Sequence, residues 1–159
     1  MLGVAIEEME HLQVVSLLLT VLGGAPNFRT QDFPYEIDIY PFPLNIEPLS
    51  AHSLAKYVYV EASRNNINLG HPENQSPERQ AFLQRLYKFL PVQKANQIGS
   101  LYGNIIDLMN NVQIENKEGW IEQLENIRTS GEVDHFEFFK EVFLGKSEGL
   151  AVGSGASNV

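Results

Sequence analysis

Residues 5–24, AIEEMEHLQVVSLLLTVLGG, constrain the fold most, because they form one amphipathic helix with polar groups on its apolar face. At about 100° per residue, the face that carries Leu18 and Leu22 also carries Glu8 and His11. A buried acid or imidazole is costly unless a hydrogen bond, an opposite charge or a metal ion satisfies it. This helix therefore predicts a polar site inside a helical core.

Composition narrows the class of protein. The 159 residues are 43% hydrophobic, which suits one folded domain with a sizeable core. A net charge of -9 argues against nucleic acid as a partner, since binding to a phosphate backbone needs clustered lysine and arginine. The chain has no cysteine, so a bound metal must be held by oxygen and nitrogen atoms.

A membrane span is not expected. The apolar run over residues 14–22 is interrupted by Ser16 and Thr20, and it is shorter than the ~20 apolar residues that cross a bilayer. The segment before it carries three glutamates and no lysine or arginine, the opposite of a secretory leader. We therefore expect a cytoplasmic protein.

The rest of the chain predicts an all-α fold with one long connection. A first helix over about residues 4–22 ends at the glycines 23–24. The proline-rich, aromatic stretch 25–48 is expected to be an ordered crossover loop, with a substrate-gating loop as the alternative. A helical domain is predicted over residues 1–145, followed by a flexible Gly/Ser-rich tail over 146–159. The later helices are predicted from residue 49 to about 63, from 77 to about 90, from about 92 to 112, around 120–127, and, after a break at 130–131, from 132 to about 144.

In the helix predicted over residues 92–112, one apolar stripe is expected to face the core. The residues of this stripe are Ile98, Leu101, Ile105, Leu108 and Val112.

The last predicted helix repeats the unusual pattern of the first. Glu132 and His135 lie on its apolar side, again three residues apart. Because residues at i and i+3 share one side of a helix, each of the two helices can offer a carboxylate and an imidazole to the same point. Such paired motifs hold two metal ions in carboxylate helix bundles, and oxygen and imidazole donors suit iron or manganese. Glu61, on the apolar stripe of the second helix, is a fifth candidate ligand.

Several motifs of the chain resemble those of a known family. Residues 6–12, IEEMEHL, followed by GGAP at 23–26, are similar to the EEM-x-HL…GG-x-P signature of the ferritin-like domain of iminophenylpyruvate dimer synthases. The resemblance extends to about residue 144 and implies a ferritin-like bundle with an iron-type redox site. Further similar motifs follow in the family's order at residues 47–49, 59–61, 98–102 and 131–136.

The chain also departs from that family. We expect it to lack a counterpart to the family's usual first helix, and Ser100 stands where the family's IGE-x-Y motif carries an acid. The ligands that remain are Glu8, His11, Glu132 and His135, with Glu61 as a substitute, which leaves a mononuclear or degenerate site as an alternative to a di-metal centre. A bundle without one helix exposes an apolar groove, which predicts a homodimer or larger assembly.

The residues leave three classes of function open. The first is a metal-dependent oxidase or oxidative-coupling component that uses iron or manganese on an unidentified small molecule. The second is a non-catalytic helical scaffold or interaction module without metal, in which buried pairs of Glu8 with His135 and of Glu132 with His11 satisfy one another. The third, a two-carboxylate hydrolase built on Glu8 and Glu132, is not favoured by the spacing.

Overall fold

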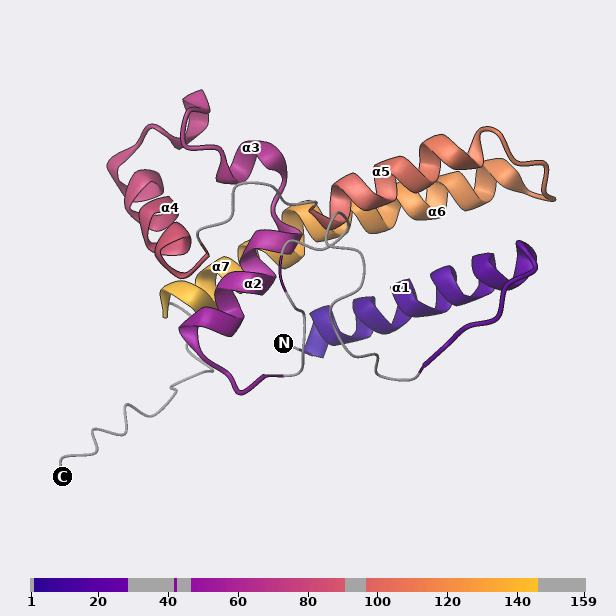
Figure 1. Ribbon diagram of the computed structural model, residues 1–159, viewed down its shortest axis with the longest axis horizontal. Coiled ribbons are helices and arrows are strands. Elements are labelled where there is room, and N and C mark those ends of the chain that lie inside the picture. Colours follow the sequence, from indigo (N-terminus) through magenta and orange to yellow (C-terminus); the bar gives the residue numbers. More distant parts are fainter. Residues whose placement is uncertain (1, 29–41, 43–46, 91–96, 146–159) are drawn as a thin grey trace.

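The computed structural model describes residues 2–28, 42, 47–90 and 97–145 as helices and short connections, with no strand among them (Figure 1). It confirms the all-α prediction. Most of the predicted crossover loop and the whole predicted tail lie outside the described residues. The elements are α1 (Leu2–Val21), α2 (Ala51–Glu61), α3 (Arg64–Ile67), the 3-10 turn η1 (Pro72–Asn74), α4 (Pro77–Phe89), α5 (Ile98–Met109), α6 (Lys117–Ser130), the π-helix η2 (Gly131–His135) and α7 (Phe136–Leu144).

Helix ends follow local chemistry. The Ser50 hydroxyl accepts a hydrogen bond from the Ser53 N–H, and the Ser53 hydroxyl accepts one from the Ser50 N–H, so that a capping box starts α2. Ser76 caps α4 in the same way by accepting from the Arg79 N–H. After α1 the chain turns at Gly23 with φ +84°, a left-handed conformation that favours glycine. The predicted helix start at Ser76 and the predicted helix end at the glycines 23–24 are confirmed, whereas α2 begins at Ala51, two residues later than predicted.

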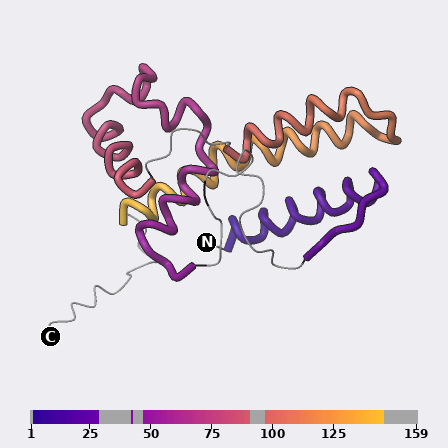
Figure 2. Tube along the Cα trace, in the orientation of Figure 1, coloured from indigo at the N-terminus to yellow at the C-terminus, as the bar shows by residue number. Residues whose placement is uncertain are grey.

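The larger core lies between α2, α4 and α7, which come together at one end of the molecule (Figure 2). Leu83 and Leu86 of α4 have no exposed surface. The Phe82 ring meets the rings of Phe136 and Phe143 edge to face, with centroids 6.3 Å apart in both pairs. Each such side chain stabilises the fold by about 1.5–3 kcal/mol through burial alone, so this end of the molecule is well packed.

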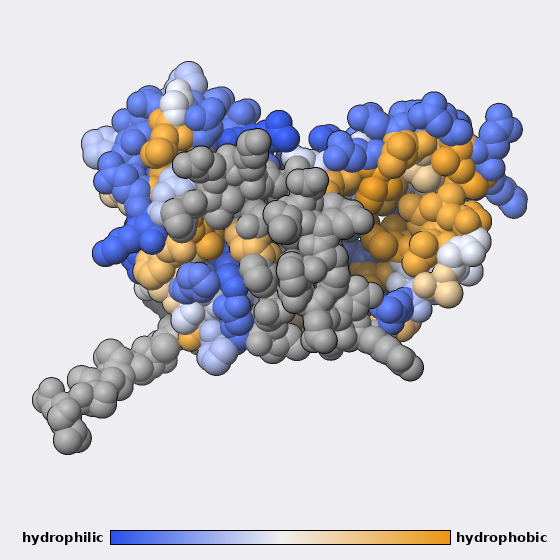
Figure 3. Space-filling view, viewed as in Figure 1, coloured by the Kyte–Doolittle hydropathy of each residue, from blue (hydrophilic) through white to orange (hydrophobic). Residues whose placement is uncertain are grey.

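A smaller core lies between α1, α5 and α6. Its buried members are Leu18, Ile106, Met109 and Leu124. Leu18 is the buried residue of α1, while other apolar side chains of this helix, such as Met9 at 66% exposure, face outward. Figure 3 shows apolar surface gathered over the end that carries α1, α5 and α6. None of the helices in the described ranges is long and apolar enough to span a membrane.

The predicted inward face of α5 is wrong in part. Ile105 is 40% and Leu108 is 67% exposed, whereas Ile106 and Met109 are buried against α6 and α1. α5 is apolar on more than one face, so its sequence alone does not decide which stripe packs. Contact with α6 selects the stripe.

The predicted break at residues 130–131 is also wrong. Gly131 has helical angles, φ -58° and ψ -50°, and the helix continues from α6 through η2 into α7. Within η2 the Phe136 N–H bonds to the Gly131 carbonyl, five residues back, which is the mark of a π-turn. Packing on both sides of this point offsets the low helix propensity of glycine. Between residues 63 and 77, where no helix is predicted, the structure has the short elements α3 and η1.

Candidate metal centre

Three of the predicted ligands come together. Glu8 and His11 from α1 and His135 from η2 each offer one ligand atom, and these atoms all lie within 4.8 Å of one another. One helical turn separates the first two, so that His11 Nδ1 lies 3.8 Å from Glu8 Oε1. The rings of His11 and His135 have centroids 5.5 Å apart. Segments more than 120 residues apart in the sequence thus form one group of two imidazoles and one carboxylate.

His135 is held by two carboxylates. Its Nδ1 lies 2.8 Å from Glu8 Oε1, and its Nε2 lies 3.0 Å from Glu7 Oε2. The hydrogen bond from His135, followed by one from the Ser130 hydroxyl, lowers the pKa of Glu7. An ionised carboxylate only accepts hydrogen bonds, so the Nε2–H of His135 donates to Glu7 and Nδ1 is the nitrogen that faces the cluster.

Burial within the cluster is uneven. The side chain of His135 is 1% exposed and that of His11 is 16% exposed, whereas that of Glu8 is 51% exposed. The expectation that Glu8 points into a closed interior is therefore wrong, because α1 touches the other helices along a narrow line only. The imidazoles form the inner wall of the site, and Glu8 stands on its open side.

Glu61 lies beside this group, though it is not one of the three close ligands. It is 7% exposed, and one carboxylate oxygen would be 3.0 Å from a Cβ atom placed on Gly131. Burial, with a smaller contribution from the charge of Glu8, raises the pKa of Glu61 to about 8. Without a nearby cation this carboxyl is mostly protonated at neutral pH.

Glu132 is the predicted ligand that the structure separates from the group. Its carboxylate lies against α5 in the space left by Gly99, where a Cβ atom would collide with it. The prediction assumed α-helical spacing between Glu132 and His135, but the wider π-turn of η2 rotates the two side chains apart. Among the described residues no ion pair joins Glu132 to His11, whereas the Glu8–His135 contact of the scaffold hypothesis is present.

Sequence reasoning missed two neighbours of the cluster. On a helical wheel Glu7 lies within about 20° of Leu18, so the sequence could have shown that Glu7 shares the inward face of α1. Tyr102 of α5 has its pKa raised by burial and by the charges of Glu8 and Glu61, which places its phenol close to both acids. Its position within a motif of the family resemblance, residues 98–102, was the available signal.

Comparison with known proteins gives one result. A family model described as Ferritin-like matches residues 1–154. Neither the comparison with curated proteins nor that with solved structures gives a match.

Proposed function

The chain belongs to the ferritin-like family, and from that premise we propose that it binds one iron or manganese ion through Glu8, His11 and His135. The observation that carries this proposal is the meeting of two histidines and one carboxylate, the ligand set of many non-haem iron enzymes. Ligand atoms of one ion lie about 2 Å from it, hence at most about 4 Å apart. The observed spread of 4.8 Å needs only a small adjustment of side chains.

The surroundings of His135 support the same proposal. Metal-binding histidines usually donate their second N–H to a carboxylate, which fixes the tautomer and the ring orientation. Glu7 occupies that position, and the Ser130 hydroxyl holds the Glu7 carboxylate in turn. The Nδ1 atom of His135 is thereby directed at Glu8 and His11.

We assign the site to oxidation of a small molecule, as an oxidase or an oxidative-coupling component. A bound iron or manganese ion would supply redox chemistry with oxygen or peroxide as the oxidant. The half-exposed Glu8 leaves the site accessible from one side, and the protonated Glu61 can hold a proton beside it.

We also propose that the chain is related more closely to iminophenylpyruvate dimer synthases, because the motifs at residues 6–12 and 23–26 are similar to theirs. We further propose a cytoplasmic location, which the acidic character of residues 7–10 supports.

Metal content measured by mass spectrometry tests the binding. Protein purified without a histidine tag should retain about one iron or manganese ion per chain, and His11→Ala and His135→Ala should lose it. His52→Ala, which removes a half-exposed imidazole outside the cluster, is the matched control. Glu7→Gln should weaken binding by about 10–100-fold, the usual effect of removing a carboxylate that orients a ligand. Equal metal content in wild type and His135→Ala would refute the site.

One observation favours the second candidate function, a scaffold without metal. His135 is already paired with Glu7 and Glu8, so its burial is satisfied by these acids alone. A scaffold should unfold at the same temperature in strong chelator as in added Mn²⁺. A metalloprotein should gain stability with the metal by RT ln(1 + [L]/Kd), about 3 kcal/mol at a hundredfold excess over Kd.

We also propose that two copies associate through α1. α1 exposes large apolar side chains such as Ile6, Met9 and Leu17, and its outer face carries two shallow grooves of 540 and 410 Å³. In a chain of net charge -9, Glu10 is the acid that lines them, so two copies can meet there with little repulsion. A two-fold axis brings the same patch of both copies together, which makes a second copy the simplest partner.

Light scattering after size exclusion tests this association. Wild type should elute as a dimer, and Met9→Glu should be monomeric because it places a charge in both grooves. Val133→Glu alters an exposed apolar residue outside the grooves and should remain dimeric. A monomeric wild type would exclude the proposed dimer.

A further inference from the structure

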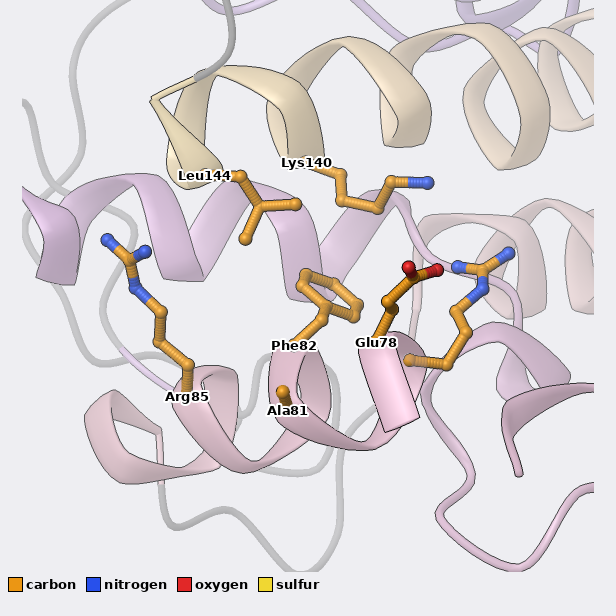
Figure 4. Close-up of a pocket in the computed structure, with 7 residues that line it drawn as sticks. Glu78, Ala81, Phe82, Arg85, Lys140 and Leu144 are labelled. Atoms are coloured by element: carbon orange, nitrogen blue, oxygen red, sulfur yellow. The ribbon is translucent and has the colours of Figure 1, made fainter. Parts of the chain in front are cut away.

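A second site lies on the far side of the larger core from α1. Between α4 and α7 the surface is hollowed into a cleft of 470 Å³, a size typical of small-molecule sites (Figure 4). No member of the candidate metal centre lines it. The residues that line it and matter here are Glu78, Arg79, Phe82, Arg85, Lys140 and Leu144.

The cleft has an apolar middle and charged ends. Figure 4 shows Phe82 and Leu144 facing each other across the middle, with Arg85 at one end and Glu78 and Lys140 at the other. This arrangement suits a ligand with an apolar body and a charged group.

The charges of the cleft are unusual for this protein. The chain has 11 lysines and arginines against 20 acids, yet three of those cations line this one cleft. Lys140 pairs with Glu137, and Glu78 adds a carboxylate at the rim. Arg79 and Arg85 have no ion-pair partner among the residues that the structure describes. The two guanidinium groups therefore leave unbalanced positive charge beside an apolar surface.

One nitrogen of Arg79, a residue that lines the cleft, lacks an acceptor. Arg79 Nη1 is buried, and no group in the structure accepts its hydrogen bond. A buried donor without a partner is unfavourable, more so when it is charged. The group that would satisfy it is an anionic oxygen, and a guanidinium prefers a carboxylate or phosphate.

The other two cations lie over aromatic rings. Arg85 Cζ is 4.8 Å from the centroid of the Phe143 ring, and Lys140 Nζ is 5.4 Å from that of Phe136. Such contacts hold a cation against an apolar surface while its remaining N–H groups stay available. The positive charge is thus held close to the apolar middle of the cleft.

We infer that the α4–α7 cleft binds an organic monocarboxylate with an apolar aryl or alkyl body. The carboxylate accepts a hydrogen bond from the guanidinium of Arg79, which lines the cleft, and the body lies on Phe82 and Leu144. The guanidinium groups of Arg79 and Arg85 disfavour an organic cation, and Glu78 together with the apolar middle disfavours a small polyanion such as free phosphate. This inference is independent of the proposed metal site.

Calorimetric titration with octanoate tests the inference, with octanol and octylammonium as neutral and cationic probes of the same length. Octanoate should bind at least about tenfold more tightly than either, because only a carboxylate satisfies the guanidinium. Arg79→Gln should weaken octanoate binding by about tenfold. Arg128→Gln, which removes a guanidinium already paired with Glu125, should leave the affinity unchanged.

The location of binding is tested separately on wild-type protein, so the result does not depend on whether a variant folds. Octanoate should shift the backbone amide NMR signals of α4 and α7, and Met9→Glu on α1 should bind octanoate as wild type does. Equal affinity for octanoate and octanol, shifts confined to α1, or unchanged binding by a folded Arg79→Gln would each overturn the inference.

Discussion

The α2–α4–α7 end and the α1–α5–α6 end of the molecule contain similarly apolar helices but differ in how completely these are covered. In the first, Leu83 and Leu86 have no exposed surface and aromatic rings fill the centre. In the second, Leu18 is the buried residue of a twenty-residue helix, and Leu108 of α5 is largely exposed. Apolar content is therefore not the same as burial, and only the first end is well packed within one chain.

Polar contacts connect α1 to the rest of the molecule where apolar packing is thin. Glu7 and Glu8 reach His135 in η2, which continues into α7 and so into the larger core. A metal ion held by Glu8, His11 and His135 would strengthen this connection. The candidate metal centre thus lies where the continuous α6–η2–α7 helix passes from one end of the molecule to the other.

The largest expected effect is the loss of stability when a leucine in each core is replaced by alanine, which leaves a cavity of matched size. Leu86→Ala should lower the free energy of unfolding by about 4–5 kcal/mol, because the packed larger core cannot collapse around the cavity. Leu124→Ala in the smaller core should cost only about 2–3 kcal/mol, since its half-covered neighbours can relax. Urea unfolding followed by circular dichroism measures both. Equal losses of the free energy of unfolding in the two variants would mean that the two cores are equally well packed.

A smaller effect should appear in the pH dependence of metal-free protein. The pKa of Glu61 is raised to about 8 in the folded protein from 4.5 in the unfolded chain, so between these values the unfolded chain has released a proton that the folded protein keeps. Stability should therefore be fully present below about pH 4.5 and should fall by about 1.4 kcal/mol per pH unit up to about pH 8.

Glu61→Gln should abolish that slope, because the amide does not titrate. Glu78→Gln, on the exposed start of α4, is the control and should keep the slope. Urea midpoints measured from pH 5 to 8 distinguish the two. A slope that survives in Glu61→Gln would assign it to another group.

The smallest effect concerns local opening of α1. Backbone amides of α1 should exchange with deuterium faster than those of α4, because few buried contacts hold the helix. Added Mn²⁺ should slow exchange in α1 by about tenfold while leaving α4 nearly unchanged. His11→Ala should remove the response to the metal. Uniform protection of both helices without metal would show that α1 is held more firmly than its exposure indicates.

Much of the helical architecture follows from the sequence because its signals are local. Ser50, Ser76 and Gly23 act on backbone groups within a few residues of themselves, so they mark helix ends whatever the rest of the chain does. The pairing of Glu8 with His11 is local in the same sense, because one helical turn brings them together.

The inclusion of His135 in the group depends on a helix pattern repeated in a distant segment. The sequence shows this pattern but does not place the segment in space.

Tertiary structure decided which of these residues meet. In the π-turn of η2, the side chain of His135 points toward α1 and that of Glu132 lies against Gly99. Regular α-helical spacing would have placed both side chains on one side of the helix. Packing against α6 turns Met109 inward and leaves Leu108 exposed, and burial against Gly131 raises the pKa of Glu61. Sequence by itself determined most of the helical segments and which side chains need a partner, because both depend mainly on near neighbours. The partner that each side chain has depends on contacts between distant segments, which exist only in the folded chain.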